Sequence, residues 1–182
     1  MAYSTIAHVG YVLMGIGSGS EFGITNVLIY LTVYLVLVVG TFGCILSAKV
    51  NNLYLEEISD LSGIGKSQPI FSLAFSIMLL GLAGIPPMAG FFAKFYLFIA
   101  VLRAEMYWLV IIAALSTVVG AYYYLRIIKV MYFDEPKQEL DKLSNPELNV
   151  IIGASAMFTL LFFVNHSMIV DRAGQAAASL FN

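Results

Sequence analysis

The sequence contains few charged residues and few residues of the kinds that bind metals or form disulfides. Only 11% of its 182 residues are charged, the net charge is -2, and there are two histidines and one cysteine. Without a basic patch interleaved with exposed aromatic residues, a nucleic-acid partner is excluded. Cys44 alone cannot form an internal disulfide, and no cysteine or histidine lies at the spacing of a zinc site.

Motifs for autonomous catalysis are also lacking. The sequence has no phosphate-binding loop, no nucleophile triad and no cluster of metal ligands. We therefore expect no catalytic residue, no metal, no bound cofactor and no independent catalytic activity in this chain. The N-terminus has no basic region ahead of its first apolar run, so a cleaved signal peptide is not expected either.

Apolar residues dominate what is present. They make up 60% of the chain, and the mean hydropathy is +0.90, both far from the values of a typical soluble domain. A bilayer core about 30 Å thick needs about 20 apolar residues of helix to cross it. The sequence therefore predicts an all-α, polytopic transmembrane helix bundle that forms a single domain over residues 1–182.

Five segments are candidate membrane spans, separated by polar or charged stretches. The first is short, and it starts abruptly at Met1, which favours a truncated or split chain. Between the second and third spans, charged residues alternate with leucines and isoleucines, which predicts a short amphipathic helix that lies at the interface. The spans are expected at about residues 2–17, 26–47, 69–102, 106–132 and 148–170, with the interfacial connector at 48–68.

The third span is too long for one straight helix. At 1.5 Å per residue, the segment 69–102 would measure about 51 Å, well beyond the hydrocarbon thickness. Pro86 and Pro87 remove two backbone donors, and Gly84 and Gly90 loosen the backbone on either side. We therefore expect two half-helices in one crossing, with a break near Ile85.

The distribution of lysine and arginine predicts the orientation. If the segment 69–102 crosses once, six basic residues lie on the side where the chain begins and two on the other side, so the first side faces the cytoplasm or matrix. The six are Lys49, Lys66, Arg126, Lys129, Lys137 and Lys142, and the two are Arg103 and Arg172.

Lys94 is the strongest candidate for a functional residue. It lies seven residues beyond Pro87 and eight before Leu102, hence near the middle of the membrane if the helix breaks at the prolines. A charge there costs about 2.5 to 3.5 kcal/mol on insertion scales. Burial disfavours the charged form of an amine, which allows proton exchange. The alternative is that Lys94 extends its side chain to the interface.

Polar residues form stripes on the predicted helices. Ser4, His8 and Tyr11 lie on one face of the first span. His8 can accept a proton on one ring nitrogen and donate from the other, although a neutral histidine bonded to a neighbouring helix fits equally well. The other stripes contain Tyr30, Tyr34, Thr41 and Cys44; Ser116, Gly120 and Tyr123; and Ser155, Thr159, Phe162 and His166.

These stripes have two interpretations. Small and hydroxyl-bearing residues on one helix face are what ordinary transmembrane packing requires. Four polar stripes could instead surround a hydrated path at Lys94. On the second interpretation, the residues that carry protons are Lys94 and His8, and the possible channel lining consists of Ser4, Tyr34, Thr41, Ser116 and Tyr123.

Three stretches of the sequence resemble a known family. A-Y-S-T-I-A-H-V-G-Y, L-A-G-I-P-P-M-A-G-F-F-A-K-F-Y and A-Y-Y-Y-L-R look like the antiporter-like subunit 2 of respiratory complex I, NADH:quinone oxidoreductase, which is chain N in bacteria. The same core occurs in sister subunits, in multisubunit cation/proton antiporters and in membrane-bound hydrogenases. The resemblance covers essentially the whole chain but only the last five of the family's fourteen helices.

The resemblance implies roles for residues and partners. Lys94 would be the lysine that a broken helix places on a central hydrophilic axis, and His8 would line that axis. NADH, FMN, iron-sulfur clusters and quinone would be bound by partner subunits. The chain would sit in the mitochondrial inner membrane or the bacterial plasma membrane, beside antiporter-like subunit 4 and the missing N-terminal part of its own subunit.

Two alternatives to a proton-translocating subunit of a redox-driven pump stay open. One is a subunit of a multisubunit cation/proton antiporter, and the other is a structural membrane scaffold without transport. The family's first nine helices are absent from this sequence, so we expect either a split-gene product or a fragment, and the chain would not pump alone.

Overall fold

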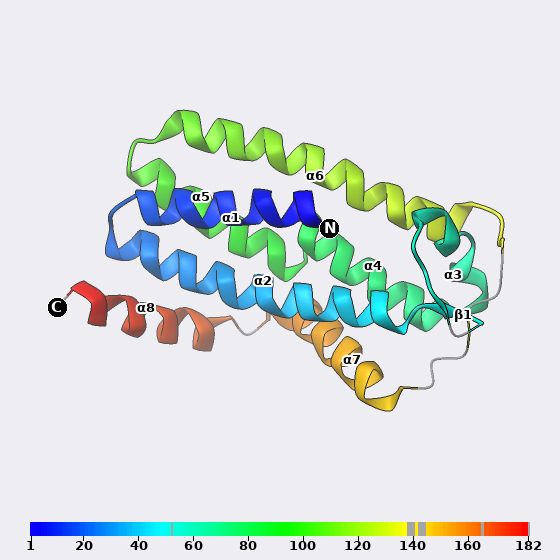
Figure 1. Ribbon diagram of the computed structural model, residues 1–182. Helices are drawn as coiled ribbons and strands as arrows, with labels where there is room; N and C mark the ends of the chain where they lie inside the picture. The colour runs from blue at the N-terminus through cyan, green and yellow to red at the C-terminus, as the bar shows by residue number, and fades with distance from the viewer. Residues whose placement is uncertain (52, 138–140, 142–144, 165, 182) are drawn as a thin grey trace.

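The apolar runs fold into helices that extend along a common direction (Figure 1). The computed structural model describes residues 1–51, 53–137, 141, 145–164 and 166–181. The helices are α1 Ala2–Gly17, α2 Glu21–Ser47, α3 Ile64–Ser67, α4 Pro69–Ala83, α5 Ala89–Arg103, α6 Tyr107–Phe133, α7 Pro146–Leu161 and α8 Ser167–Phe181. A short 3-10 helix, η1 Ile58–Leu61, and an antiparallel pair of two-residue strands, β1 Lys49–Val50 and β2 Leu53–Tyr54, complete the elements.

Helix α2 lies at the centre of the bundle. It packs against α1, α4, α5, α7 and α8, and its side chains Ile29, Tyr30, Val33 and Leu37 are almost fully buried. Helix α6 lies at the periphery, where Trp108, Leu115 and Val119 expose most of their surface. Exposed apolar side chains on a membrane helix face lipid or another polypeptide, so α6 forms an outer face of this unit.

The prediction of a helical membrane bundle is confirmed. Within the described residues, α2 and α6 are each long and apolar enough to cross a bilayer. Helices α4 and α5 follow one another from one end of the bundle to the other, so they make one crossing between them (Figure 1). That single crossing is the condition on which the orientation prediction depends.

Basic residues gather at one end of the bundle. The connector with Lys49 and Lys66 lies at the end where α6 finishes with Lys129, whereas α5 finishes with Arg103 at the opposite end (Figure 1). Lys142 lies outside the described residues. This separation is the one that the sequence predicts for the two membrane sides.

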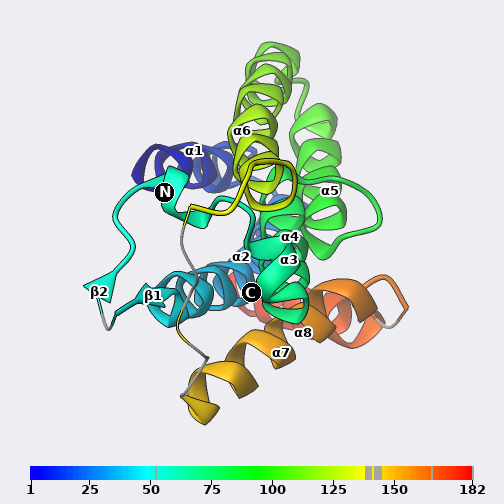
Figure 2. The same cartoon turned by 90° about the vertical axis from the view of Figure 1, so that its right-hand side faces the viewer.

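The connector differs from the predicted amphipathic helix. It contains the strands β1 and β2, then η1 and the four-residue helix α3, all at one end of the bundle (Figure 2). Two left-handed residues, Asn51 (φ 51°) and Gly63 (φ 69°), interrupt any continuous helix here. Asp141, beyond the end of α6, contacts the connector, because its amide donates to the Lys49 carbonyl oxygen at 2.8 Å.

The fifth expected span, 148–170, is not one helix. Helix α7 ends at Leu161, and α8 begins at Ser167 and continues to Phe181, where the sequence predicted a short tail. Both helices pack on α2, and α8 does so through the buried small side chains of Ala173 and Ala177. The polar residues Asn165, His166 and Ser167 lie at the boundary between α7 and α8, and apolar residues on both sides hid this short interruption in the predicted span.

Close packing of α4 on α5 depends on glycine. A Cβ atom at Gly90 would overlap the carbonyl oxygen of Gly81, and one at Gly81 would lie 2.5 Å from Leu37 Cδ2. Backbone atoms cannot move aside as a flexible side chain can. The two half-helices therefore meet at a distance that only glycine permits.

We expect Gly90→Ala to destabilise the chain by about 1–3 kcal/mol, because the added methyl group overlaps the Gly81 backbone. The matched control is Gly153→Ala in α7, where a Cβ atom would meet nothing within 4 Å. Detergent-solubilised membranes are heated, and an immunoblot gives the amount of chain that stays soluble. The measurement is the temperature at which half of the chain has left the soluble fraction. Equal midpoints for the two variants would contradict this account of the packing.

Candidate functional site

The site is built on the break between α4 and α5. Helix α4 stops at Ala83 because Gly84 takes the left-handed conformation (φ 80°), which glycine adopts without strain. The Gly84 amide donates to the carbonyl oxygens of Leu80 and Gly81, both at 3.0 Å. Pro86 and Pro87 follow, and α5 begins at Ala89. The predicted break near Ile85 is confirmed.

The last carbonyls of α4 hold the ammonium group of Lys94. The Nζ atom donates to the carbonyl oxygen of Leu82 at 2.8 Å and to that of Ala83 at 3.2 Å. Helix carbonyls at a C-terminus have no partner within their own helix and carry the negative end of the helix dipole. They therefore stabilise the charged form of a lysine that is only 7% exposed.

Lys94 does not extend toward either end of the bundle. Its contacts are with the mid-bundle carbonyls, and a Cβ atom at Gly84 would lie only 3.2 Å from Nζ. The side chain thus occupies space that glycine leaves free. The alternative interpretation, in which Lys94 extends to the interface, does not fit these contacts.

His8 lies in a cluster of tyrosines contributed by α1 and α2. Its Nδ1 atom is 2.6 Å from the hydroxyl oxygen of Tyr30, and its ring stacks on Tyr34 with the centroids 4.5 Å apart. His8 and Tyr30 are both buried. The imidazole therefore has a hydroxyl group on one side, with which it can exchange a proton in either direction depending on its tautomer.

Two further tyrosines link α1 to α6. The Tyr11 hydroxyl is hydrogen-bonded to Thr117 Oγ1 at 2.9 Å, and the Tyr11 ring centroid lies 5.4 Å from Lys94 Nζ. About two helical turns away, Ser4 is hydrogen-bonded to Tyr124. These contacts hold α1 against α6 beside the lysine.

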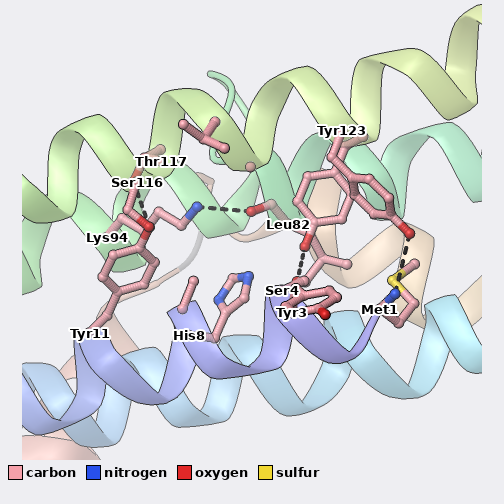
Figure 3. A pocket seen from close by; sticks show the side chains of 14 residues that line it. Met1, Tyr3, Ser4, His8, Tyr11, Leu82, Lys94, Ser116, Thr117 and Tyr123 are labelled. Carbon is pink, nitrogen blue, oxygen red and sulfur yellow. Dashed lines mark hydrogen bonds between the residues drawn. The ribbon is translucent and has the colours of Figure 1, made fainter.

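A cavity of about 340 Å³ lies between α1, α5 and α6. Figure 3 shows Lys94, His8 and Tyr11 directed into it, with Ser116 and Thr117 on the opposite side. A cavity of this volume holds several water molecules. Its polar lining is Tyr3, Ser4, His8 and Tyr11 from α1, Lys94 from α5, and Ser116, Thr117, Tyr123 and Tyr124 from α6.

The structure brings most of the predicted site residues together. Ser4, His8, Lys94, Ser116 and Tyr123 line the same cavity. Tyr34 stacks behind His8, whereas Thr41 lines a separate small cavity toward the connector. Gly84, Pro86, Pro87 and Gly90 form the break, as predicted.

Sequence reasoning missed Thr117 and Tyr124. The prediction selected Ser116 and Tyr123 on α6, where Ser116 accepts a hydrogen bond from Tyr11 at 3.5 Å. Their neighbours Thr117 and Tyr124, which also bond to Tyr11 and Ser4, were not selected. Thr117 and Tyr124 are seven residues apart and so share a helix face, which was the available signal. The carbonyl groups that bind Lys94 could not be predicted from the sequence, because every residue has a backbone carbonyl group.

The stripe predicted on the fifth span does not reach the cavity. Thr159 donates to the Ser155 carbonyl oxygen at 2.8 Å, and Ser155 packs against Gly40 of α2. His166 lies 3.3 Å from the Tyr96 hydroxyl, on a part of α5 that does not line the cavity. Here ordinary helix packing is the better interpretation. No group of three metal-binding side chains forms within the described residues.

A broken helix with a buried lysine and a polar cavity at mid-bundle is an arrangement found in membrane proteins that translocate ions. The family model for the NADH:quinone oxidoreductase/Mrp antiporter transmembrane proteins matches residues 1–120. The chain belongs to this family and is an integral membrane protein.

Sequence relatives are subunits of bacterial NADH-quinone oxidoreductases. The chain is 46% identical over 180 residues to subunit N from Rhodospirillum rubrum, covering 99% of this chain and 37% of that protein. It is 47% identical over 171 residues to subunit N from Pelagibacter ubique, covering 94% and 36%. The chain thus spans little more than a third of the length of these curated relatives.

Solved structures give the same fold. A chain of respiratory complex I from Thermus thermophilus is 25% identical with a TM-score of 0.77, over 93% of this chain and 38% of that one. A chain of the Mrp complex from Dietzia sp. is 21% identical with a TM-score of 0.86, over 100% of this chain and 42% of that one. The likeness to the chain of the Mrp complex shows a shared fold and no more.

We expect Tyr30→Phe to destabilise the chain by about 1–3 kcal/mol, because it leaves the buried Nδ1 of His8 without its hydroxyl partner. Tyr122→Phe is the matched control, since Tyr122 is 71% exposed on α6. The temperature at which half of the solubilised chain has unfolded gives the stability of each variant. If Tyr30→Phe unfolds at the wild-type temperature, the hydrogen bond between His8 and Tyr30 does not stabilise the chain.

Proposed function

We propose that this chain translocates protons as part of the membrane arm of a NADH-quinone oxidoreductase. The observation that carries the proposal is the buried Lys94 ammonium, held by the Leu82 and Ala83 carbonyl oxygens at a helix break. An ionisable group at this depth is costly, and the default interpretation is that it is functional. The sequence relatives, which are subunit N proteins, favour the same activity.

The lysine alternates between charged and neutral forms in this proposal. When the charge is present, the two carbonyl oxygens stabilise it; when the proton leaves, it enters the polar cavity that His8 and Tyr11 also line. His8, bonded to Tyr30, relays protons on that side. Charges that shift elsewhere in the membrane arm change the proton affinity of Lys94 electrostatically.

Redox chemistry belongs to other subunits in this proposal. NADH, FMN, iron-sulfur clusters and quinone bind to partner chains, and this chain binds no cofactor. The remainder of the relatives' length, either a separate chain or another part of the same one, completes the translocation path. The further partners are antiporter-like subunit 4 and other membrane-arm subunits, within a bacterial plasma membrane or a mitochondrial inner membrane.

A second candidate is a subunit of a multisubunit cation/proton antiporter. The fold likeness to a chain of an Mrp complex favours it. The two candidates differ in their driving force, because an antiporter exchanges protons for a cation, whereas the pump depends on electron transfer. Transport that requires sodium and ignores NADH would favour the antiporter.

We expect Lys94→Met to abolish proton transport through this chain while the chain stays inserted in the membrane. The matched control is Lys129→Met, which removes a lysine that is 69% exposed at the end of α6. NADH-driven acidification of inverted membrane vesicles gives the rate, and an immunoblot gives the amount of chain. Undiminished transport in Lys94→Met would contradict the proposal and leave a structural scaffold as the remaining candidate.

We also expect the chain to migrate on a native gel of mildly solubilised membranes with a very large, NADH-oxidising assembly. An antibody against the chain and an in-gel stain for NADH oxidation locate the two signals. A small or NADH-inactive species carrying the chain would instead support the antiporter or the scaffold.

A further inference from the structure

Lys94 has no carboxylate partner within the described residues, where the salt bridge joins Lys129 with Asp134. Its ammonium group has two hydrogen-bond acceptors there, the carbonyl oxygens of Leu82 and Ala83. An ammonium group has three donor hydrogens, so these carbonyls leave one N–H without an acceptor in the described part of the chain. Because an unpaired buried charge is unfavourable, a further stabilising contact is expected.

The aromatic ring of Tyr11 is that contact. The Nζ atom of Lys94 lies over the ring, 5.4 Å from its centroid. A cation within about 6 Å of a ring centroid, over the ring face, is attracted by the negative charge of that face, and the attraction is larger where water is excluded. Both side chains are buried. The lysine is thus held from two elements, by backbone of α4 and by a ring of α1.

The Tyr11 ring is fixed by aromatic neighbours. It is 4% exposed, and it makes T-shaped contacts at centroid distances of 5.8, 6.2 and 6.0 Å with His8, Tyr30 and Phe98. Such edge-to-face pairs are a preferred arrangement of aromatic side chains. The three neighbours come from α1, α2 and α5, so the ring cannot turn away from Lys94 without displacing one of them.

The hydroxyl group fixes the far end of the same side chain. Thr117 Oγ1 donates to the Ala113 carbonyl oxygen at 3.0 Å, so its oxygen accepts from the Tyr11 hydroxyl at 2.9 Å. Figure 3 shows the Tyr11 side chain extending from α1 to Ser116 and Thr117 of α6, beside Lys94. The hydrogen bonds of this hydroxyl within the described residues all go to α6. Tyr11 therefore acts on the lysine through its ring.

We propose that Tyr11 is a positioning residue for Lys94, whose ring holds the ammonium group against the Leu82 and Ala83 carbonyl oxygens. The inference rests on the proposed function, since it assigns a second residue to the site that holds the proton. The ring attracts the charged amine far more than the neutral one. The Nζ atom is thus held at the helix break for as long as it carries the proton.

Solid-state NMR of the lysine-labelled native complex tests the position of the ammonium group directly. Protons over the face of an aromatic ring resonate at lower frequency because of the ring current. We expect such a shift for Lys94 relative to surface lysines, and we expect Tyr11→Leu to remove it and Tyr11→Phe to retain it. A Lys94 signal that is the same in Tyr11→Leu and wild type would overturn the inference. This result does not depend on whether the chain transports protons.

Ring variants test the effect on transport. In the native complex, we expect Tyr11→Leu to slow NADH-driven proton transport per chain by about tenfold, the size of an ammonium–ring attraction in a site without water. Phe75→Leu is the matched control, because it removes a ring that is 2% exposed on α4 and does not line the cavity. We expect less than about a twofold change from it. Tyr11→Phe keeps the ring and should recover most of the rate.

The outcomes separate this inference from the proposed function. If Lys94→Met abolishes transport but Tyr11→Leu and Phe75→Leu behave alike, or Tyr11→Phe loses as much as Tyr11→Leu, the role of the ring is wrong and the function stands. If Lys94→Met transports normally, the proposed function fails, and the NMR shift alone decides whether the ring positions the amine. Loss in Tyr11→Leu that Tyr11→Phe restores supports both.

Discussion

The contact between the Lys94 ammonium and the last carbonyls of α4 is the interaction on which the rest of the site depends. A lysine in the middle of an apolar bundle needs compensation, and the carbonyl oxygens of Leu82 and Ala83 supply it only because α4 stops there. A continuous helix would use both groups in its own hydrogen bonds. The break is thus a binding site for a charge, and its position fixes the depth at which the Lys94 ammonium is held.

The surrounding structure follows from that requirement. Gly84 turns the chain and leaves room for Nζ, while Gly90 lets the next half-helix approach the backbone of Gly81. Tyrosines from α1 and α2 then enclose His8 beside the cavity that Lys94 lines. Because those tyrosines combine a large apolar ring with one hydroxyl, they pack tightly and still offer polar contacts along the cavity wall.

Features with strong local chemistry were predictable from the sequence. The overlong apolar run and its paired prolines predict the break, and a lone lysine next to it predicts the site. The connector was predicted wrongly, because the left-handed residues Asn51 and Gly63 and the docking of Asp141 depend on tertiary contacts. The boundary between α7 and α8 was missed because the polar stretch Asn165–His166–Ser167 is short and has apolar residues on both sides. On α6, Ser116 and Tyr123 line the cavity as predicted, and the adjacent Thr117 and Tyr124 were missed because periodicity locates a face only to within about one position.

The measurement that tests the central claim most directly is the charge on Lys94 Nζ in working membranes. Nitrogen-15 solid-state NMR on lysine-labelled native complex can report it, with the Lys94 signal identified by its absence from Lys94→Met. The account predicts a signal that differs from those of surface lysines and that redistributes between charged and neutral forms when NADH is supplied. A signal that stays in one charge state before and during NADH oxidation would contradict it.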